Sequence, residues 1–199
     1  MEFKKIQLNG FKSFAEKTNF LIEKGLTGIV GPNGCGKSNI VESLRWCMGE
    51  TSAKSMRGSG MEDVIFSGTS NKPSKNIAEV VLSLNNENKD GPQQYNDLDE
   101  IEIRRKIEKD KGSKFYINNK EVRAKDAQMF FADLSTGAHS PSLISQGRIG
   151  ALVTAKPSDR RAILEEAAGI AGLHVRRHEA EIRLGAAENN LNRADELRR

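Results

Sequence analysis

One octapeptide constrains the fold of this chain more than any other segment, because it fits a phosphate-binding pattern at every fixed position. Residues 31–38 read Gly-Pro-Asn-Gly-Cys-Gly-Lys-Ser and match G-x-x-x-x-G-K-[ST]. The glycines allow a tight bend that turns several backbone N–H groups toward one point, where they form a nest for phosphate oxygens. Lys37 can place its ammonium between terminal phosphates, and Ser38 can offer a hydroxyl to Mg²⁺. The octapeptide therefore predicts a site for a nucleoside triphosphate.

The residues on either side of the octapeptide support this interpretation. Residues 26–30 form a short apolar run that predicts a buried strand, and residues 38–48 carry apolar side chains at helical spacing. A strand, a glycine loop and a helix in this order would point the helix N-terminus at the phosphates. The alternative is a glycine-rich turn that matches the pattern by accident, and such a turn does not require these flanks.

Length and composition limit the classes of protein to which the chain can belong. Its 199 residues, 37% hydrophobic and 29% charged, are enough for one domain with an appendage. We find no apolar run long enough to span a membrane and no signal-peptide core at the N-terminus, so we expect a cytoplasmic protein. Cys35 and Cys47 fit neither a zinc ribbon nor a disulfide framework. The net charge of +4 is too small to establish a nucleic-acid partner.

The first 150 residues alternate apolar and polar positions in several short segments, as strands do. An Asn118-Asn119-Lys120 turn predicts a hairpin, because asparagine tolerates positive φ. The polar stretch 85–100 predicts an exposed loop. We predict an α/β core with an attached antiparallel β layer, with strands over residues 3–8, 20–22, 78–84, 101–107, 114–117 and 121–123.

The pattern becomes helical after Pro157. Ser158 is a candidate N-cap, and residues 160–168 favour a helix. Beyond Gly169, apolar positions recur at alternating steps of three and four, which indicates a coiled-coil seam whose partner strand comes from another molecule or from another part of a longer polypeptide. An ordinary amphipathic surface helix is the alternative. The seam positions are Ile170, Leu173, Arg177, Ala180, Leu184, Ala187, Leu191 and Ala194.

Five blocks of sequence, taken in order, resemble one family: the SMC (structural maintenance of chromosomes) ATPases, and specifically the N-terminal half of a bacterial condensin-type head. The blocks resemble the family's N-terminal signature, its extended phosphate loop, the segment with its head-head arginine, its Q-loop and its entry into the coiled coil. They are Gly10–Phe14, Gly31–Val41, Ser55–Phe66, Ile144–Ile149 and Lys156–Ile170.

The resemblance implies a fold and a division of the chain. The fold class is α/β, a P-loop NTPase with an ABC-ATPase-like head, an antiparallel β layer and an emerging antiparallel coiled-coil arm. Residues 1–168 would form the N-terminal lobe of the head, and residues 169–199 the start of the arm, or neck.

The resemblance also implies the site and its cofactors, ATP and Mg²⁺. Lys37, Gln146 and Arg57 would take part in catalysis, and Ser38 and Gln146 would hold the metal. Arg57 precedes Gly58, Ser59 and Gly60, so we expect it on a flexible loop from which it can reach a phosphate; a solvated surface arginine or glutamine is the alternative for Arg57 and Gln146. The nucleotide would contact Lys12, Ser13, Phe14, Gly31, Pro32, Asn33, Gly34, Cys35, Gly36, Lys37, Ser38 and Asn39, although Phe14 suits a core position equally well.

Two elements that ATP hydrolysis needs are missing from the sequence. We find no apolar strand that ends in Asp-Glu and no Leu-Ser-Gly-Gly signature; residues 134–137 are only a partial echo. In the family both elements lie in the C-terminal half, so we expect a half-site. The implied partners are that C-terminal half, a second head in a homodimer, a kleisin subunit at the neck and DNA, with no membrane and a nucleoid-associated location. Another coiled-coil repair ATPase and a nucleotide-gated interaction module without hydrolysis are the alternatives.

Two further groups of residues leave their function open. His174 and His178 have a spacing that can bind metal on a helix, but a solvated face is the simpler interpretation. A basic cluster around one predicted strand pair suits either a DNA backbone or a solvated face, and few aromatic residues lie near it. The cluster comprises Arg104, Arg105, Lys106, Lys109, Lys111 and Lys114.

Overall fold

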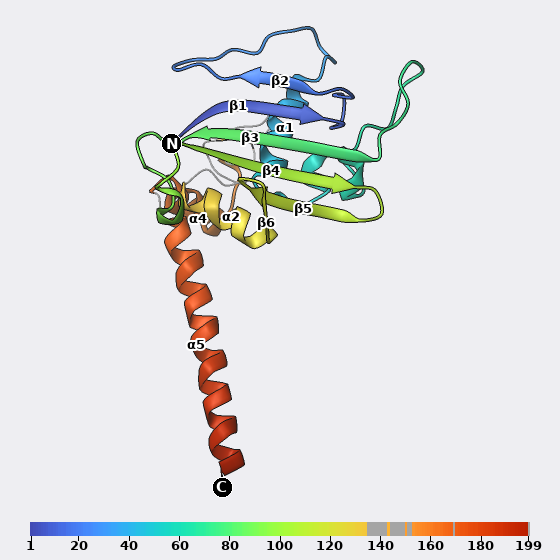
Figure 1. Ribbon diagram of the computed structural model, residues 1–199. Coiled ribbons are helices and arrows are strands. Elements are labelled where there is room, and N and C mark those ends of the chain that lie inside the picture. Colours follow the sequence, from blue (N-terminus) through green and yellow to red (C-terminus); the bar gives the residue numbers. More distant parts are fainter. Residues whose placement is uncertain (135–142, 144–149, 151–152, 169, 199) are drawn as a thin grey trace.

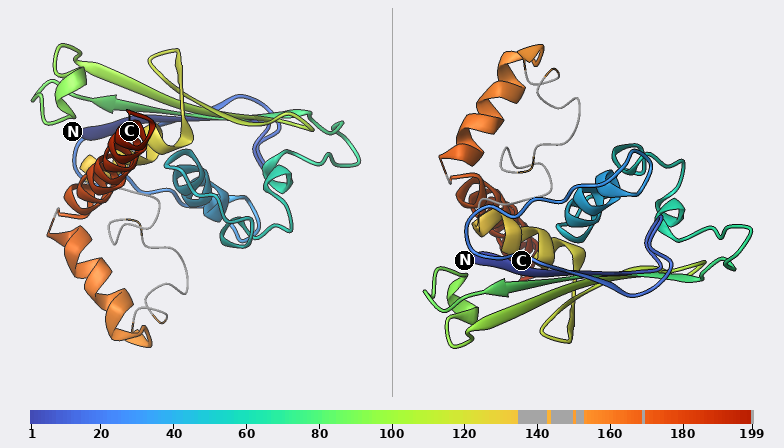
Figure 2. Two further views of the ribbon diagram at one scale, coloured as in Figure 1. Left: turned by 90° about the horizontal axis from the view of Figure 1, so that it is seen from below. Right: turned by 90° about the horizontal axis from the view of Figure 1, so that it is seen from above.

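The computed structural model describes residues 1–134, 143, 150, 153–168 and 170–198, in which one antiparallel sheet carries helices on one face (Figures 1 and 2). The six strands lie in the order β2-β1-β3-β4-β5-β6. They are β1 (Glu2–Asn9), β2 (Thr18–Leu21), β3 (Ile77–Asn85), β4 (Glu100–Glu108), β5 (Gly112–Ile117) and β6 (Lys120–Val122). The helices are α1 (Lys37–Cys47), α2 (Ala124–Asp133), α4 (Pro157–Ala167) and α5 (Ala171–Arg198), with short 3-10 turns η1 (Lys54–Met56), η2 (Met61–Val64) and η3 (Gln93–Tyr95).

The core lies between the sheet and α1. Alternate residues of β1, β3 and β4 face the helix, and the register places Leu82 of β3 between Ile6 of β1 and Ile103 of β4. Trp46 of α1 is fully buried against this face, with its ring centroid 5.4 Å from that of Phe11. The six predicted strands and the helix after the phosphate loop are confirmed. Burial alternates with period two along much of β1 and along β4, whereas Val80 to Leu84 of β3, between these two strands, are all buried.

The predicted hairpin is also confirmed. β5 and β6 pair across Asn118 and Asn119, whose φ angles are 47° and 66°. These positive values are the ones that a tight hairpin turn needs, and asparagine adopts them at lower cost than most residues do.

The predicted strand over residues 26–30 is wrong for this structure. The segment forms no strand and runs as a loop beyond the β2 edge of the sheet (Figure 1). Leu26 is 100% exposed and Val30 is 93% exposed. A strand needs a neighbour for its backbone hydrogen bonds, and within the described residues no strand pairs with this segment. The apolar pattern is therefore present without the partner that would bury it.

The helices differ from expectation in two details. α2 was not predicted, although Ala127, Phe130 and Phe131 follow helical spacing and are buried against the sheet. α4 begins at Pro157, so Ser158 lies inside the helix and is not its N-cap; proline suits the first helical position because its φ is already helical and its missing N–H needs no acceptor there.

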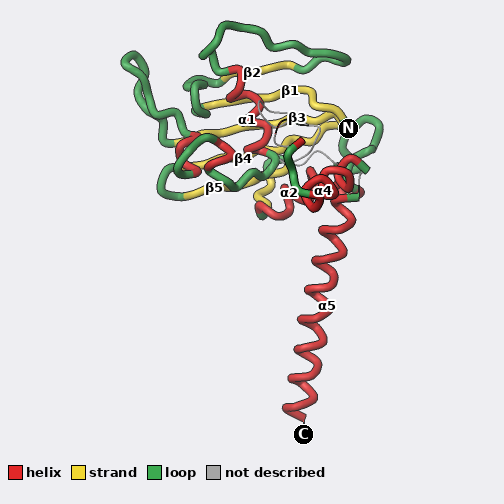
Figure 3. The backbone as a smooth tube through the Cα atoms, turned by 180° about the vertical axis from the view of Figure 1, so that it is seen from behind, coloured by secondary structure: helices red, strands yellow, loops and turns green. Residues whose placement is uncertain are grey.

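The long helix α5 leaves the head as a single projecting rod (Figures 1 and 3). It packs on α2 at its start, where Arg176 forms an ion pair with Asp133. Along the helix, the seam residues Leu173, Leu184 and Leu191 are each about two-thirds exposed. An apolar seam that stays exposed over several turns is typical of one strand of a coiled coil.

The basic cluster predicted around β4 is not a continuous cationic stripe. Arg105 points into the core and is 3% exposed, so it cannot reach a nucleic-acid backbone. Arg104 lies on the opposite face, over the ring of Tyr116 and 3.6 Å from Glu79. Strand alternation explains the difference, since neighbouring residues face opposite sides of a sheet.

Candidate functional site

The phosphate loop forms the N-terminal approach to α1. Gly36 stands at the N-cap with a φ of 96°, and Gly34 has a φ of 85°, which are conformations that side chains disfavour. Within the described structure no side chain caps the N-terminus of α1 and its first turn holds no acidic residue. The positive end of the helix therefore meets solvent at the loop, an arrangement that suits an anion.

Lys37 lies folded over its own loop. Its Nζ donates hydrogen bonds of 2.6 Å to the carbonyl oxygens of Gly31 and Pro32. Loop residues 31–35 are exposed, and so is Ser38 at the start of the helix. Of the two side chains that the motif assigns to phosphate and Mg²⁺, Ser38 is therefore exposed, and the partly buried Lys37 contacts carbonyl oxygens of the exposed loop.

The segment 12–14 packs directly on the phosphate loop. A Cβ atom built on Gly36 would lie 2.5 Å from Oγ of Ser13, so only glycine allows this approach. Phe14 is half-buried and its ring meets that of Phe20 edge-on at 5.7 Å. Phe14 is thus a packing residue that also borders the loop, and its contact with nucleotide stays a prediction.

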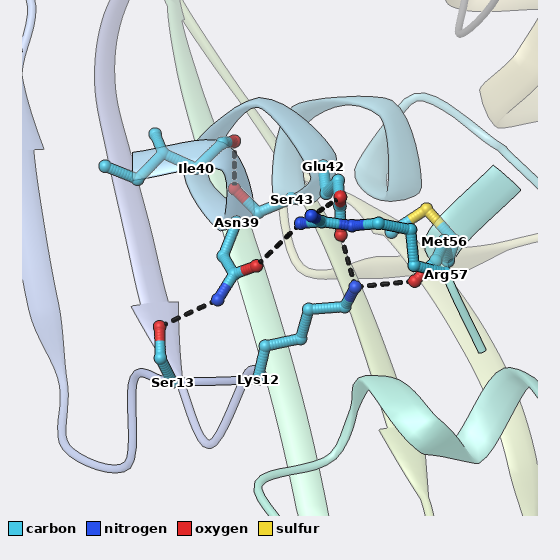
Figure 4. Close-up of polar contacts among 8 residues, drawn as sticks. All are labelled: Lys12, Ser13, Asn39, Ile40, Glu42, Ser43, Met56 and Arg57. Carbon is cyan, nitrogen blue, oxygen red and sulfur yellow. Dashed lines mark hydrogen bonds and ion pairs between the residues drawn. The ribbon is translucent and has the colours of Figure 1, made fainter. Parts of the chain in front are cut away.

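A network of polar side chains connects segment 12–14, α1 and the turn after η1 (Figure 4). Asn39 Nδ2 donates to Ser13 Oγ at 2.9 Å, and Arg57 donates to Asn39 Oδ1 at 3.2 Å. Glu42, one turn farther along α1, forms ion pairs with both Arg57 and Lys12. Four residues that the resemblance assigned to the site from three separate segments are therefore in one cluster.

Arg57 is held in place and does not lie on a loose loop as its neighbours suggested. It ends η1 in the left-handed conformation, with a φ of 54°. The turn that follows is closed by Asp63, whose Oδ2 accepts from the backbone of Ser59 and Gly60 at 2.6 and 2.9 Å. Hydrogen bonds from Gly60 first, and then from Ser59, hold the pKa of Asp63 below its usual value. Gly58 and Gly60 therefore belong to a closed turn.

Some predicted features cannot be placed. Gln146 lies outside the described residues, as do residues 135–137 of the partial signature echo. His174 and His178 are on α5, and the described part of the chain holds no group of three or more histidine, cysteine or acidic residues that could hold a metal. For Mg²⁺ this part of the chain offers the Ser38 hydroxyl, which fits a metal completed by nucleotide phosphates and by ligands from elsewhere.

Sequence reasoning missed Glu42. Its side chain is 9% exposed, although it carries a charge on a helix that begins at an open loop. The signal was its spacing: Glu42 follows Asn39 by three residues, so the two share a helix face with the octapeptide's final residues. What the sequence could not reveal is that Lys12 and Arg57 meet that face from segments 30 residues before it and 15 residues after it.

The fold and the loop define a nucleotide-binding head of the ABC-ATPase type, and the comparison with protein families agrees. The model of the RecF/RecN/SMC N terminal domain matches residues 2–147, so the chain belongs to this family. None of the helices described here is long and apolar enough to cross a membrane.

Several relatives with similar sequence or structure are SMC proteins. The chain is 57% identical over 197 residues to the chromosome partition protein Smc of Rhodopseudomonas palustris, covering 99% of this chain and 17% of that protein. A Pyrococcus furiosus Smc head domain with an extended coiled coil, bound to the C-terminal domain of ScpA, is 34% identical with a TM-score of 0.79, over 98% of this chain and 49% of that one. A structure from work on the ATP-driven dimerization and DNA-stimulated activation of SMC ATPases is 33% identical with a TM-score of 0.72. The match covers 84% of this chain and 99% of that one.

Proposed function

We propose that this chain is the ATP-binding, N-terminal half of an SMC ATPase head. The observation that carries the proposal is the cluster at the start of α1, where an anion-binding loop, Lys37 and the Ser13–Asn39–Arg57 network converge. Mg-ATP would supply the phosphoanhydride bond to be cleaved. Lys37 and the loop amides would bind its phosphates, Ser38 would ligate the metal, and Arg57 would stabilise phosphate charge. Gln146 would orient the metal or the attacking water.

The half-site character is supported by an exposed apolar surface. Leu26, Ile29 and Val30 are 100%, 47% and 93% exposed directly before the phosphate loop. Apolar residues gathered beside a catalytic loop mark a surface that another polypeptide covers. We assign that role to the C-terminal half of the same head, which would pair a strand with residues 26–30 and bring the acidic residues that this chain lacks.

The partners and the division of the chain belong to the same proposal. Two complete heads would form a homodimer around ATP, and the cycle of engagement and release would act on DNA in chromosome condensation and segregation, in the nucleoid region of the cytoplasm. A kleisin subunit would bind the neck. The boundary between residues 168 and 169 is supported by the end of α4 at Ala167 and the start of α5 at Ala171. These assignments are supported by the ATP-driven dimerization and DNA-stimulated activation described for SMC ATPases, and by the Pyrococcus furiosus Smc head bound to ScpA.

The decisive experiment mixes this chain with its C-terminal counterpart. We expect negligible ATP hydrolysis by the 199-residue chain alone, and a complex whose phosphate release rises when DNA is added. Full hydrolysis by the chain alone would refute the half-site. ATP-dependent assembly without phosphate release would favour a nucleotide-gated interaction module, the alternative of a different class.

A further inference from the structure

Glu42 is the buried junction of two cations that come from segments before and after α1 in the sequence. Its Oε2 pairs with Lys12 and its Oε1 pairs with Arg57 (Figure 4). The carboxylate side chain is only 9% exposed. A carboxylate this deeply buried needs a counter-charge, because an unpaired ion away from water costs several kilocalories per mole.

The two ion pairs differ in how firmly they are held. Lys12 is 13% exposed, and its Nζ also donates a 2.5 Å hydrogen bond to the carbonyl oxygen of Met56. The backbone N–H of Lys12 donates to Val64 O at 2.7 Å, which fixes that segment as well. The Arg57 side chain is 59% exposed, and besides Glu42 it donates a 3.2 Å hydrogen bond to Asn39 Oδ1. The Lys12 contact is thus part of the buried structure, whereas the Arg57 contact faces solvent.

Charge balance adds to this asymmetry. Glu42 pairs with two cations, and the Asp63 carboxylate also interacts electrostatically with Lys12. If Arg57 turns away, Lys12 still neutralises Glu42 and no buried charge is left without a partner. If Lys12 left, the buried end of the network would lose its anchor at Met56. The geometry therefore allows Arg57, but not Lys12, to exchange partners at low cost.

We propose that Glu42 is a positioning residue that competes with nucleotide phosphate for Arg57. Lys12 holds Glu42 in place, and Glu42 with Asn39 keeps Arg57 over the first turn of α1 until a phosphate takes the guanidinium. This inference rests on the proposed ATP site. A guanidinium suits such an exchange because it binds carboxylate and phosphate with the same planar donor geometry.

The test measures binding of a non-hydrolysable ATP analogue with Mg²⁺ to a complete head, in which this chain is combined with the C-terminal half. Removing the competing charge by Glu42→Gln should tighten binding about threefold, within roughly two- to fivefold, as expected for loss of one ion pair whose arginine is solvent-exposed. In an Arg57→Ala background the same Glu42→Gln change should leave the affinity unaltered, because the competition acts only through Arg57. A purely structural role would not create this dependence.

Three outcomes would overturn the proposal: unchanged binding by a folded Glu42→Gln head, weaker binding, or a gain that persists without Arg57. If Glu42→Gln does not fold, Glu42→Asp decides, since it keeps a charge for Lys12 with a shorter reach toward Arg57; tighter binding supports competition and unchanged or weaker binding contradicts it. Glu62→Gln is the matched control, an exposed carboxylate nearby that binds the Asp110 backbone and not Arg57. Lys37→Ile must abolish binding in every background; if it does not, the ATP site itself is wrong, a failure distinct from that of Glu42.

Discussion

The two cysteines occupy contrasting environments, and their reactivity reports on the site. Cys35 is exposed in the phosphate loop, while Cys47 is buried at the end of α1 with its Sγ 3.7 Å from the carbonyl oxygens of Val80 and Ile103. Burial raises the pKa of Cys47 from 9.0 to about 12. The thiolate is the reactive form, so Cys47 should be inert at neutral pH.

We therefore predict that a disulfide reagent at pH 8 modifies one thiol rapidly in the folded chain and two in denaturant. Mg-ATP should slow the modification of Cys35 in the complete head, because the nucleotide covers the loop. The raised pKa of Cys47 also makes the free energy of unfolding depend on pH. The contribution of Cys47 to that free energy is fully present below pH 9 and is lost as the pH rises toward 12, because the unfolded thiol ionises first. Rapid modification of both thiols in the folded state would contradict the burial of Cys47.

Lys37 and Gln146 should separate binding from the metal-dependent step. Lys37→Ile removes the ammonium that meets the phosphates, so we expect triphosphate binding to be abolished. Gln146→Ala should leave binding intact and impair the Mg²⁺-dependent step, because a neutral amide oxygen can ligate metal or orient water without adding charge. Equilibrium binding and phosphate release, measured on the same complete heads, distinguish the two. Equal affinity of wild type and Lys37→Ile would remove the basis for the site.

At the scale of elements, α1 is anchored at its far end by one buried arginine of β4. Arg105 donates to the carbonyl oxygens of Trp46 and Glu50 at 2.6 and 2.7 Å. Its guanidinium lies 4.4 Å from the ring centroid of Trp46 and 4.6 Å from that of Phe115. Burial lowers the pKa of Arg105 to about 10, so it remains charged at neutral pH. A cation suits this place because helix carbonyl oxygens converge there.

Arg105→Ala should lower the free energy of unfolding by about 3 kcal/mol, since it leaves two buried carbonyl oxygens without their donor and removes both ring contacts. Arg104→Ala is the matched control on the neighbouring position of the same strand. It faces the outer side of the sheet, and its loss should cost about 1 kcal/mol or less. Denaturant unfolding of the complete head measures both. If the two substitutions lowered the free energy of unfolding equally, Arg105 would contribute no more than an ordinary surface contact.

At the scale of the whole molecule, the exposed apolar loop before the phosphate loop should be an assembly surface. Leu26→Asp places a charge on a side chain that is fully exposed here, so thermal unfolding of this chain should not change. Binding of the C-terminal half should weaken at least tenfold, because assembly would bury that charge. Leu98→Asp is the control, at an exposed leucine of another loop. If both variants assemble like wild type, residues 26–30 are not covered by the partner half.

Most of the fold could be predicted from local patterns, with two exceptions that have different causes. Alternation located the strands, positive-φ asparagines located the hairpin, and a fixed octapeptide located the loop, because each depends on neighbours in sequence. α2 was overlooked although its spacing was visible. The strand at 26–30 was predicted wrongly because apolar character shows that a segment can be buried, and the strand that would pair with it is not in the described chain.

The sequence by itself determined the phosphate loop, the family resemblance and the apolar seam of the arm, since these rest on residue types at fixed spacings. Only the tertiary structure decided which charges meet. It turned Arg105 inward and Arg104 outward, closed the turn after Arg57, and placed Glu42 between Lys12 and Arg57. The physical reason is that ion pairs between distant segments depend on how the chain packs, and no local pattern encodes the partner of a buried charge.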